Sequence, residues 1–327
     1  MTISVAKEII NTIKFIMPVQ KPKGTVRQRY CLISNGWIVA ADDYMCIASP
    51  INMSINSAPN THQLRAVLAK CGEDLSITEL DKESIAVTSG ALRAVVKCVL
   101  PAQLDLKAPD PITWVVDDSL KVALKAAESL AEENTNKPEL GAVKLADMCC
   151  YGAVPMGTAA IQAFHGFSIP GTHLIPKAAA KAVCATKLAL VGIGASDNSI
   201  TFHFGNGAFI KTALHAGNFP VFEHLFETQQ VATQIPSDFY SGLAAITPFS
   251  EEGFVIFKQG VMTSKNLENK PSTYAIEGMG QDYGLDIKLL LKVKANFKNI
   301  ILEEKQVIFY NENMRGVIAK AVERNVE

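Results

Sequence analysis

The chain has 327 residues, of which 48% are hydrophobic and 19% charged, and its formal net charge is −1. This composition is that of a globular protein and excludes a disordered or fibrous chain. The nearly neutral charge gives no sign of a nucleic-acid partner by itself, so any such argument depends on where the charges lie. At about 100–200 residues per domain, the length predicts two or three domains.

The first expected element is an amphipathic helix over 3–16, within "MTISVAKEIINTIKFIMP". Lys7, Glu8 and Lys14 interrupt its apolar residues, so this segment does not have the pattern of a signal peptide. No apolar run approaches the ~20 residues that a membrane helix needs. We therefore expect the protein to stay in the compartment where it is made, the cytoplasm.

The cysteines form no C-x-x-C pair and have no zinc spacing. Most of them fall in apolar strand or helix patterns, so we expect reduced, buried thiols. They are Cys31, Cys46, Cys71, Cys98, Cys149, Cys150 and Cys184.

One order of elements, an apolar helix followed by three strands separated by turns, is predicted three times along the chain. It covers residues 62–99, 176–214 and 286–322. When these segments are aligned, Ile85, Ile200 and Val307 fall in register, about one third of the chain apart. Alternating apolar residues support the strands, and Gly or Asn in the turns tolerates positive φ.

Each of these segments is preceded by another amphipathic helix and two or three strands. The helices are expected over 3–16, 118–132 and 236–247, and the strands over roughly 30–51, 140–169 and 253–279. This order predicts an α+β fold of three repeated domains, each with two helices packed on antiparallel sheet. The predicted domains are 1–109, 110–227 and 228–327. The alternative is chance similarity between three ordinary α+β stretches.

No enzyme motif is recognisable. The chain lacks the P-loop, H-E-x-x-H, G-x-S-x-G and kinase signatures, and "GIGASDN" (192–198) lacks the third glycine of a dinucleotide loop. Asp42 and Asp43 form the best carboxylate pair, but neighbours on a strand point to opposite faces, which favours a turn over a metal site. We therefore expect a binding protein without a catalytic site, metal or cofactor. A metal-dependent nuclease at Asp42 and Asp43 is the enzymatic alternative.

Basic residues recur on the predicted helices without acidic neighbours. Lys177 and Lys181 share a helix face, and no acid occurs from Gly171 to Ala195. Like charges four residues apart cost a few tenths of a kcal/mol, so their repetition indicates an anionic partner. Lysine holds phosphates as a point charge and does not read bases. The candidate DNA-binding residues are Lys7, Lys14, Arg65, Lys121, Lys125, Lys177, Lys181, Lys288 and Lys292.

With this repeat, the chain resembles the bacterial DNA polymerase III β sliding clamp family along nearly its whole length. The local matches are "ISNGWIVAADDYM" (33–45), "SITFHFGNGAFIKTALHAGNFPVF" (199–222) and "IEGMGQDYGLDIKLLLKV" followed by "NMRGVIAKAV". The resemblance implies a head-to-tail homodimer that forms a closed ring of six domains around duplex DNA and tethers the replicative DNA polymerase. It also implies a clamp loader as a partner.

The family docks partner peptides in an apolar pocket between its second and third domains. Carried onto this chain, the pocket residues are Leu225, Val317, Ile318 and Ala319. The chain departs from the family at two places. It ends "IAKAVERNVE" where an apolar tail is usual, and "PMGTAAIQAFHG" (155–166) lacks the Asp-Gly-His-Arg type turn that helps to frame the pocket in the family. These departures fit a divergent or phage-encoded clamp with its own polymerase. They also motivate the alternative of a clamp-derived adaptor or decoy that binds replication proteins without encircling DNA.

Overall fold

The structure, a computed structural model, describes residues 5–104, 106–132, 136–154, 157–264, 271–277, 279, 282–293 and 297–321. It is an α+β protein, as the sequence predicts, and all strand pairings among the described residues are antiparallel. The chain divides into two compact units. The first unit comprises 1–121 and 178–214, and the second comprises 122–177 and 215–327.

The predicted helix followed by three strands is present in all three segments. In the first it is α3 (Thr61–Leu68), β5 (Ser76–Asp81), β6 (Ser84–Ser89) and β7 (Leu92–Val99). In the second it is α5 (Lys177–Ala185), β13 (Leu190–Ala195), β14 (Ser199–Phe204) and β15 (Phe209–Ala213). In the third it is α7 (Ile287–Val293), β21 (Asn299–Leu302), β22 (Gln306–Tyr310) and β23 (Met314–Ala319).

We call each of these sets of three strands a back triplet. Ile85, Ile200 and Val307 are each the second residue of the middle strand, and each is completely buried. The predicted register of the repeat is therefore confirmed.

A helix and three strands also open each repeat, and we call these strands the front triplet. The first set is α1 (Val5–Ile16), β1 (Leu32–Ser34), β2 (Trp37–Ala41) and β3 (Met45–Pro50). The second is α4 (Asp118–Leu130), β9 (Val143–Ala146), β10 (Cys149–Ala153) and β11 (Ala159–Phe164). The third is α6 (Phe239–Ile246), β17 (Phe254–Lys258), β18 (Val261–Ser264) and β19 (Ser272–Ala275).

Short elements connect these sets. The strands are β4 (Ala58–Pro59), β8 (Trp114–Val115), β12 (Thr172–Ile175), β16 (Thr233–Gln234) and β20 (Tyr283–Asp286). The helices are α2 (Val26–Arg29) and five 3₁₀ turns: η1 (Met17–Val19), η2 (Pro101–Gln103), η3 (Pro138–Gly141), η4 (Glu223–Phe226) and η5 (Thr247–Phe249).

The sheets are built across repeats. The seven-stranded sheet of the first unit has the order β1-β2-β3-β15-β14-β13-β8, so the front triplet of the first repeat is joined to the back triplet of the second. The eight-stranded sheet of the second unit has the order β12-β9-β10-β11-β23-β22-β21-β16 and joins the second and third repeats in the same way. At both junctions the third strand of a front triplet pairs with the third strand of a back triplet.

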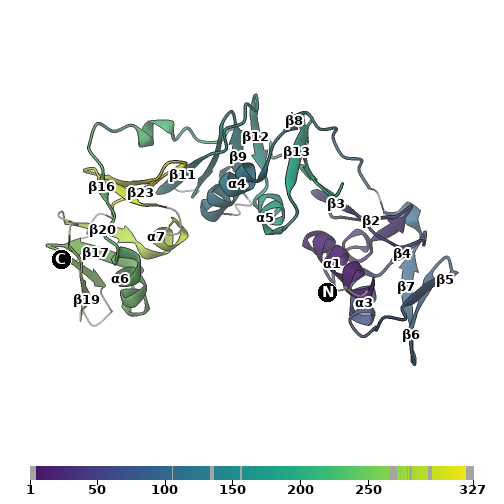
Figure 1. Cartoon of the computed structure of the whole chain (residues 1–327). Helices are drawn as coiled ribbons and strands as arrows, with labels where there is room; N and C mark the ends of the chain where they lie inside the picture. Colours follow the sequence, from purple (N-terminus) through teal and green to yellow (C-terminus); the bar gives the residue numbers. More distant parts are fainter. Residues whose placement is uncertain are drawn as a thin grey trace. The chain divides into compact units, whose positions relative to one another are not determined.

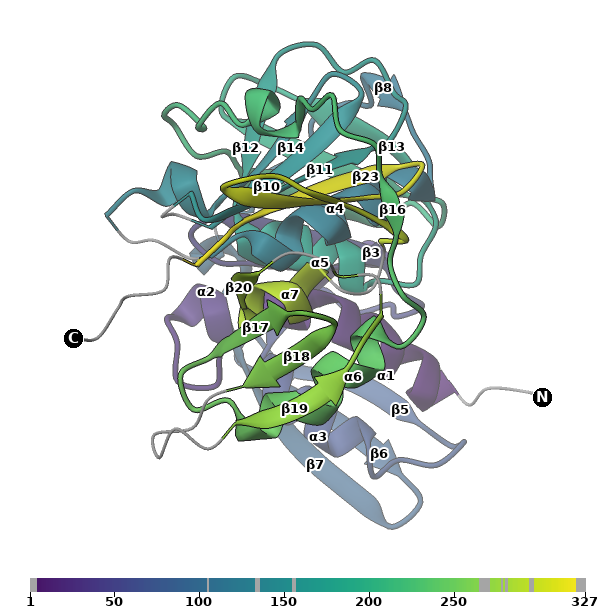
Figure 2. The same cartoon turned by 90° about the vertical axis from the view of Figure 1, so that its left-hand side faces the viewer.

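Two four-stranded sheets hold the remaining triplets. The back triplet of the first repeat forms β4-β7-β6-β5, and the front triplet of the third forms β19-β18-β17-β20. Figure 2 shows β17, β18 and β19 side by side, with α6 next to them.

Helices cover one face of the sheets in each unit (Figure 1). In the first unit Phe15 of α1 meets Phe204 of β14 edge-to-face, with ring centroids 5.7 Å apart. In the second unit α4 lies so close to β10 that a Cβ on Gly152 would be 1.9 Å from the Ala127 carbonyl oxygen. Glycine at this position therefore permits direct contact between helix and sheet backbones.

We call the face of the seven-stranded sheet that lies away from α1 the outer face. Because neighbouring residues of a strand point to opposite faces, Ser199, Thr201 and His203 lie on this outer face. The segment 106–113 crosses this face and is anchored by Asp110. The Asp110 carboxylate accepts hydrogen bonds of 2.9 Å from Lys211 Nζ, Ser199 Oγ and Thr201 Oγ1. Burial raises the pKa of Asp110, but these donors outweigh burial and leave the pKa below its ordinary value.

No disulfide joins the cysteines, and five of the seven thiols are buried, in line with the sequence. Burial raises the pKa of Cys31 to about 12. Within the described part of the chain, no helix is long and apolar enough to cross a membrane.

Candidate nucleic-acid interface

The α1 and α3 helices of the first unit expose predicted DNA-binding residues. Helix α1 buries Ile9, Ile13 and Ile16, which leaves Lys7 and Lys14 together on the opposite face, two turns apart.

On α3, Leu64 and Leu68 are buried and Arg65 is exposed. The Asn60 side chain caps the start of this helix by accepting a 3.0 Å hydrogen bond from Gln63 N–H. Arg65 is thereby presented from a short helix whose first turn is fixed.

The two lysines of α4 differ in how far their ammonium groups are exposed to solvent. Lys121 is largely buried: its ammonium donates a 2.8 Å hydrogen bond to the Leu188 carbonyl and lies 3.2 Å from an Asp118 carboxylate oxygen. The Leu190 N–H and the Lys121 ammonium both keep the pKa of Asp118 below its usual value. Lys125, one turn later, is exposed. Only Lys125 therefore presents its charge to solvent.

Lys177 and Lys181 of α5 also differ. The Lys177 ammonium donates a 2.6 Å hydrogen bond to the Ala131 carbonyl at the end of α4, and it lies 4.0 Å from Glu128 Oε1. A cation at this end of a helix meets the carbonyl groups that lack helical partners. Lys181 is exposed.

The α7 lysines repeat this division of roles. Lys292 is half-buried, and its ammonium is 2.5 Å from Glu132 Oε1. Lys288 is exposed, and its N–H donates a 2.7 Å hydrogen bond to Asp286 Oδ1, which caps the helix.

The expectation that the helix lysines lack acidic partners is thus wrong for Lys121, Lys177 and Lys292. Their partners come from α4 and the residues after it, which are distant in sequence from α5 and α7. Among the described residues, no carboxylate lies within 4.0 Å of the charged groups of the other six. These six are Lys7, Lys14, Arg65, Lys125, Lys181 and Lys288.

A basic loop was missed by the sequence reasoning, although the signal was present. No acidic residue occurs from 9 to 41, a stretch that contains Lys21, Lys23, Arg27 and Arg29. The structure closes this loop with a 2.7 Å hydrogen bond from Lys21 N–H to the Gln28 carbonyl, and Lys21 and Lys23 are exposed. Arg27 and Arg29 are half-buried, and the Arg29 guanidinium lies 5.6 Å from the centre of the Tyr30 ring.

The structure brings together some of the predicted pocket residues. Leu225 packs against a buried cluster that includes Val317, and Gln306 Nε2 donates a 3.0 Å hydrogen bond to the Leu225 carbonyl. Ala319 pairs with Gln306 in the sheet and is exposed. Ile318 is completely buried and points to the other face of β23, because neighbouring strand residues alternate. Residues 322–327 of the C-terminal tail lie outside the described residues.

Asp42 and Asp43 lie in the bend between β2 and β3, as the turn interpretation expects. Asp42 Oδ1 accepts hydrogen bonds of 2.8 and 2.7 Å from Tyr44 N–H and Met45 N–H. Across the described ranges, no group of three or more His, Cys, Asp or Glu residues is placed to hold a metal ion.

This chain is similar to known proteins in structure but not detectably in sequence. No family model matches the sequence, and no curated protein matches it. The structure is similar to the sliding clamp (DNA polymerase III subunit beta) from Bartonella birtlesii, with 13% identity, a TM-score of 0.81, and coverage of 97% of this chain and 98% of the other.

The DNA polymerase sliding clamp from Caulobacter crescentus gives 11% identity, a TM-score of 0.81, and 97% and 98% coverage. The one from Bacillus subtilis gives 12%, 0.81, and 97% of each chain. The similarity extends over nearly the whole length of both chains in each comparison. The chain therefore has the fold of the bacterial DNA polymerase sliding clamps.

Proposed function

We propose that this protein is a DNA sliding clamp, a non-catalytic processivity factor that encircles duplex DNA and tethers a replicative DNA polymerase. The observation that carries the proposal is the threefold repeat built into a sliding-clamp fold over 97% of the chain. The proposed domains are 1–109, 110–227 and 228–327, and the proposed location is the cytoplasm, in a bacterium or in a phage-infected host.

The pattern of sheet pairing supports a head-to-tail ring. Within the chain, the third strand of a front triplet pairs with the third strand of the next back triplet, in β3 with β15 and in β11 with β23. Two triplets remain without such a partner. Only the last two residues of β7 pair with β4, and the outer edge of β19 has no strand partner among the described residues.

A second copy can complete the pattern if its β19 pairs with β7 of the first. Because β7 and β19 are different surfaces, this contact is heterologous, and heterologous contacts give a ring when the rotation closes. Val95 in the middle of β7 is 61% exposed, a large apolar side chain on an open strand edge. Ring closure would cover it.

Duplex DNA is the proposed ligand of the six exposed cations that have no carboxylate partner in the described part of the chain. Lysine and arginine contacts to phosphates supply affinity without sequence readout, which suits a protein that slides. Lys121, Lys177 and Lys292 belong to the same helices, but their ammonium groups already have partners within the chain. The basic loop with Lys21 and Lys23 is a further candidate phosphate contact.

The polymerase and a clamp loader are the proposed protein partners, and Leu225, Val317, Ile318 and Ala319 remain the proposed peptide pocket. Leu225, Val317 and Ala319 can contribute to one surface, whereas Ile318 would support it from the opposite side of β23.

Solution mass tests the ring. The purified chain should have twice the mass of the 35.3 kDa monomer in sedimentation equilibrium. Val95→Glu should shift it toward monomer, because it places a charge on the proposed interface, whereas Thr78→Glu on β5 should leave the mass unchanged. A strict monomer at micromolar concentration would instead support the non-encircling adaptor that the unusual C-terminal sequence suggests.

A further inference from the structure

An apolar groove of about 440 Å³ lies on the outer face of the seven-stranded sheet, within the range of volumes that hold ligands. The registers Val39 with Ala48 and Ala48 with Phe209 place its floor on three adjacent strands. We call it the Trp37 groove. Its principal lining residues are Trp37, Val39, Ala48, Pro109, His203 and Phe209.

Three rings form one wall of the groove. The Phe209 ring is 6.5 Å from the Trp37 ring and 6.5 Å from the His203 ring, at 44° to each. His203 Nε2 donates a 2.8 Å hydrogen bond to the Asp110 carbonyl, which fixes the imidazole. Trp37 is 36% exposed. Exposed aromatic side chains in a hollow are the groups that most often anchor a protein partner.

The second unit covers the comparable face of its own sheet. There Phe219, Phe222 and Phe226, which follow β15 in the chain, are buried against the eight-stranded sheet. The segment 106–113 covers the corresponding face of the first unit only in part. Leu106 packs against the cluster that includes Ala48 and Phe209, and the Trp37 groove stays open beside Leu106 and Pro109.

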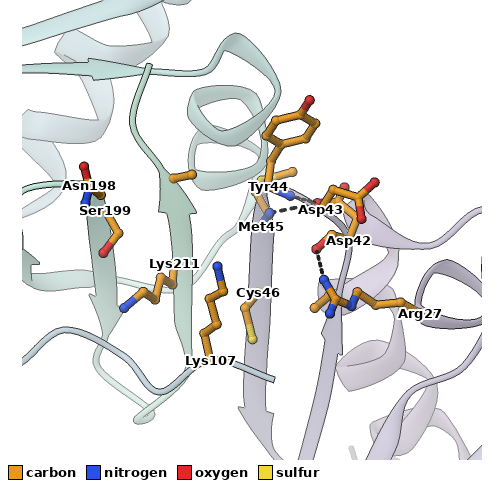
Figure 3. Close-up of a pocket in the computed structure, with 12 residues that line it drawn as sticks. Arg27, Asp42, Asp43, Tyr44, Met45, Cys46, Lys107, Asn198, Ser199 and Lys211 are labelled. Atoms are coloured by element: carbon orange, nitrogen blue, oxygen red, sulfur yellow. Dashed lines mark hydrogen bonds between the residues drawn. The ribbon is translucent and has the colours of Figure 1, made fainter. Parts of the chain in front are cut away.

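The charge at the groove is positive. No carboxylate of a described residue lines it, and the one formally charged lining side chain, Lys107, is exposed. Figure 3 shows Lys107 between Arg27 and Lys211, in a smaller pocket of about 170 Å³ that Lys107 also lines. No described carboxylate lies within 4.0 Å of the Lys107 ammonium.

The other charged groups of this smaller pocket are already engaged or face away. Arg27 Nη1 donates a 3.5 Å hydrogen bond to the Asp42 carbonyl, and Lys211 is paired with Asp110 at 2.9 Å. The Asp42 carboxylate accepts from its own turn, and Figure 3 shows Asp43 across the pocket from Lys107. Among the described residues, Lys107 is therefore the cation of this face that has no carboxylate partner.

The spacing between the two hollows matches an extended peptide. Cys46 lines the smaller pocket and Ala48, two residues along β3, lines the Trp37 groove. At about 3.3 Å per residue, the two sites are about 7 Å apart. This is the distance between residues i and i+2 of an extended chain.

We propose that the Trp37 groove docks a short extended segment of a partner protein, with an aromatic or aliphatic residue against Trp37 and Phe209 and a carboxylate two residues away on Lys107. This site is distinct from the pocket at Leu225 and Val317. It does not depend on whether the chain encircles DNA.

Tryptophan fluorescence provides the test. The chain has two tryptophans, so Trp114→Phe leaves Trp37 as the single reporter. The probes are the blocked peptides acetyl-EDFADE-amide and acetyl-KKFAKK-amide. The acidic peptide should give a saturable change in Trp37 emission with a Kd of about 0.01–0.1 mM, and the basic peptide should bind about tenfold more weakly or not at all.

Variants of the single-tryptophan protein locate the contact. Lys107→Glu should weaken the acidic peptide about tenfold, as should Phe209→Leu, which preserves an apolar side chain. Lys82→Glu makes the same charge change on an exposed turn of the same unit and should have no effect. The proposal is overturned by no saturable change up to about 1 mM peptide, by equal binding of the two peptides, or by unchanged binding to Lys107→Glu.

Discussion

Replacement of Asp110 tests whether a polar anchor holds the segment 106–113 on the outer face of the first unit. The Asp110 side chain is 10% exposed and its ion-pair partner Lys211 is 15% exposed, so solvent screens their interaction little. Asp110→Ala removes a carboxylate that accepts three hydrogen bonds and leaves the Lys211 ammonium half-enclosed without its partner.

The expected cost follows from this geometry. Hydrogen bonds to a charged group contribute about 1.5–3 kcal/mol each but are not additive, and breaking a buried ion pair from one side costs about 3–5 kcal/mol. We therefore expect Asp110→Ala to lower the free energy of unfolding of the first unit by about 3–5 kcal/mol. With an m-value of about 2 kcal/mol/M, the urea midpoint should fall by about 2 M.

Tryptophan fluorescence isolates this transition, because Trp37 and Trp114 both lie in the first unit. Asp43→Asn, an exposed neighbour, is the control and should change the free energy of unfolding by less than about 0.5 kcal/mol. Asp110→Ala combined with Lys211→Met should cost less than the sum of the single changes, because the double variant leaves no unpaired charge. An Asp110→Ala midpoint equal to that of the wild type would refute the anchor.

The Asp110 carboxylate should also make the stability of the first unit depend on pH. Folding lowers the pKa of Asp110, since the donors Lys211, Thr201 and Ser199 outweigh burial. Its contribution is therefore fully present above the ordinary carboxyl value of 3.8 and is lost as pH falls through the lowered pKa. Below pH 3.8, stability of the first unit should decline less steeply in Asp110→Asn than in the wild type.

Three further predictions concern other parts of the chain. The His165 Nε2 donates to the Ala146 carbonyl, its Nδ1 accepts from Phe167 N–H, and burial lowers the pKa of this side chain. Because the folded state therefore disfavours the charged imidazole, the thermal stability of the second unit should fall as the pH drops below about 6.5. His165→Gln should reduce this pH dependence in calorimetry. Gly194→Ala should strongly destabilise the first unit because the new Cβ would lie 2.0 Å from the Pro111 carbonyl oxygen, whereas Gly205→Ala, with its nearest contact at 3.5 Å, should be tolerated; equal urea midpoints would contradict this. Lys181→Glu with Lys288→Glu should weaken DNA binding and lower the slope of log K against log salt by about one unit for each lost phosphate contact, while Lys82→Glu with Lys305→Glu, of equal net charge, should not.

The repeat could be predicted from sequence because its signals are local. Alternating apolar residues around Ile85, Ile200 and Val307 and the turn residues between strands define each triplet without reference to the rest of the chain. The pairing of β3 with β15 and of β11 with β23 could not be predicted in this way, because it joins strands of different repeats.

For the candidate DNA-binding residues, exposure could be predicted from the sequence but ion-pair partners could not. Exposure of Lys125, Lys181 and Lys288 follows from helix periodicity, but the partner of Lys292, Glu132, lies 160 residues away in the sequence. An acid-free segment therefore does not imply an unpaired lysine. Conversely, the basic loop from 21 to 29 was recognisable from charge alone, because no acid occurs from 9 to 41.

The Trp37 groove could not be predicted from the sequence, because its wall is made by residues that meet only in the folded chain. The rings of Trp37 and Phe209 are far apart in sequence and meet because β2, β3 and β15 are adjacent strands. No spacing in the sequence links them.

Retention on circular DNA tests the central claim most directly. The protein would be assembled on nicked circular plasmid, by a loader or by reassociation of monomers, and isolated by gel filtration at a salt concentration that removes simple electrostatic binding. A topological ring predicts that the protein stays with the circle and is released when a restriction enzyme linearises it. Equal retention on circular and linear DNA would contradict encirclement.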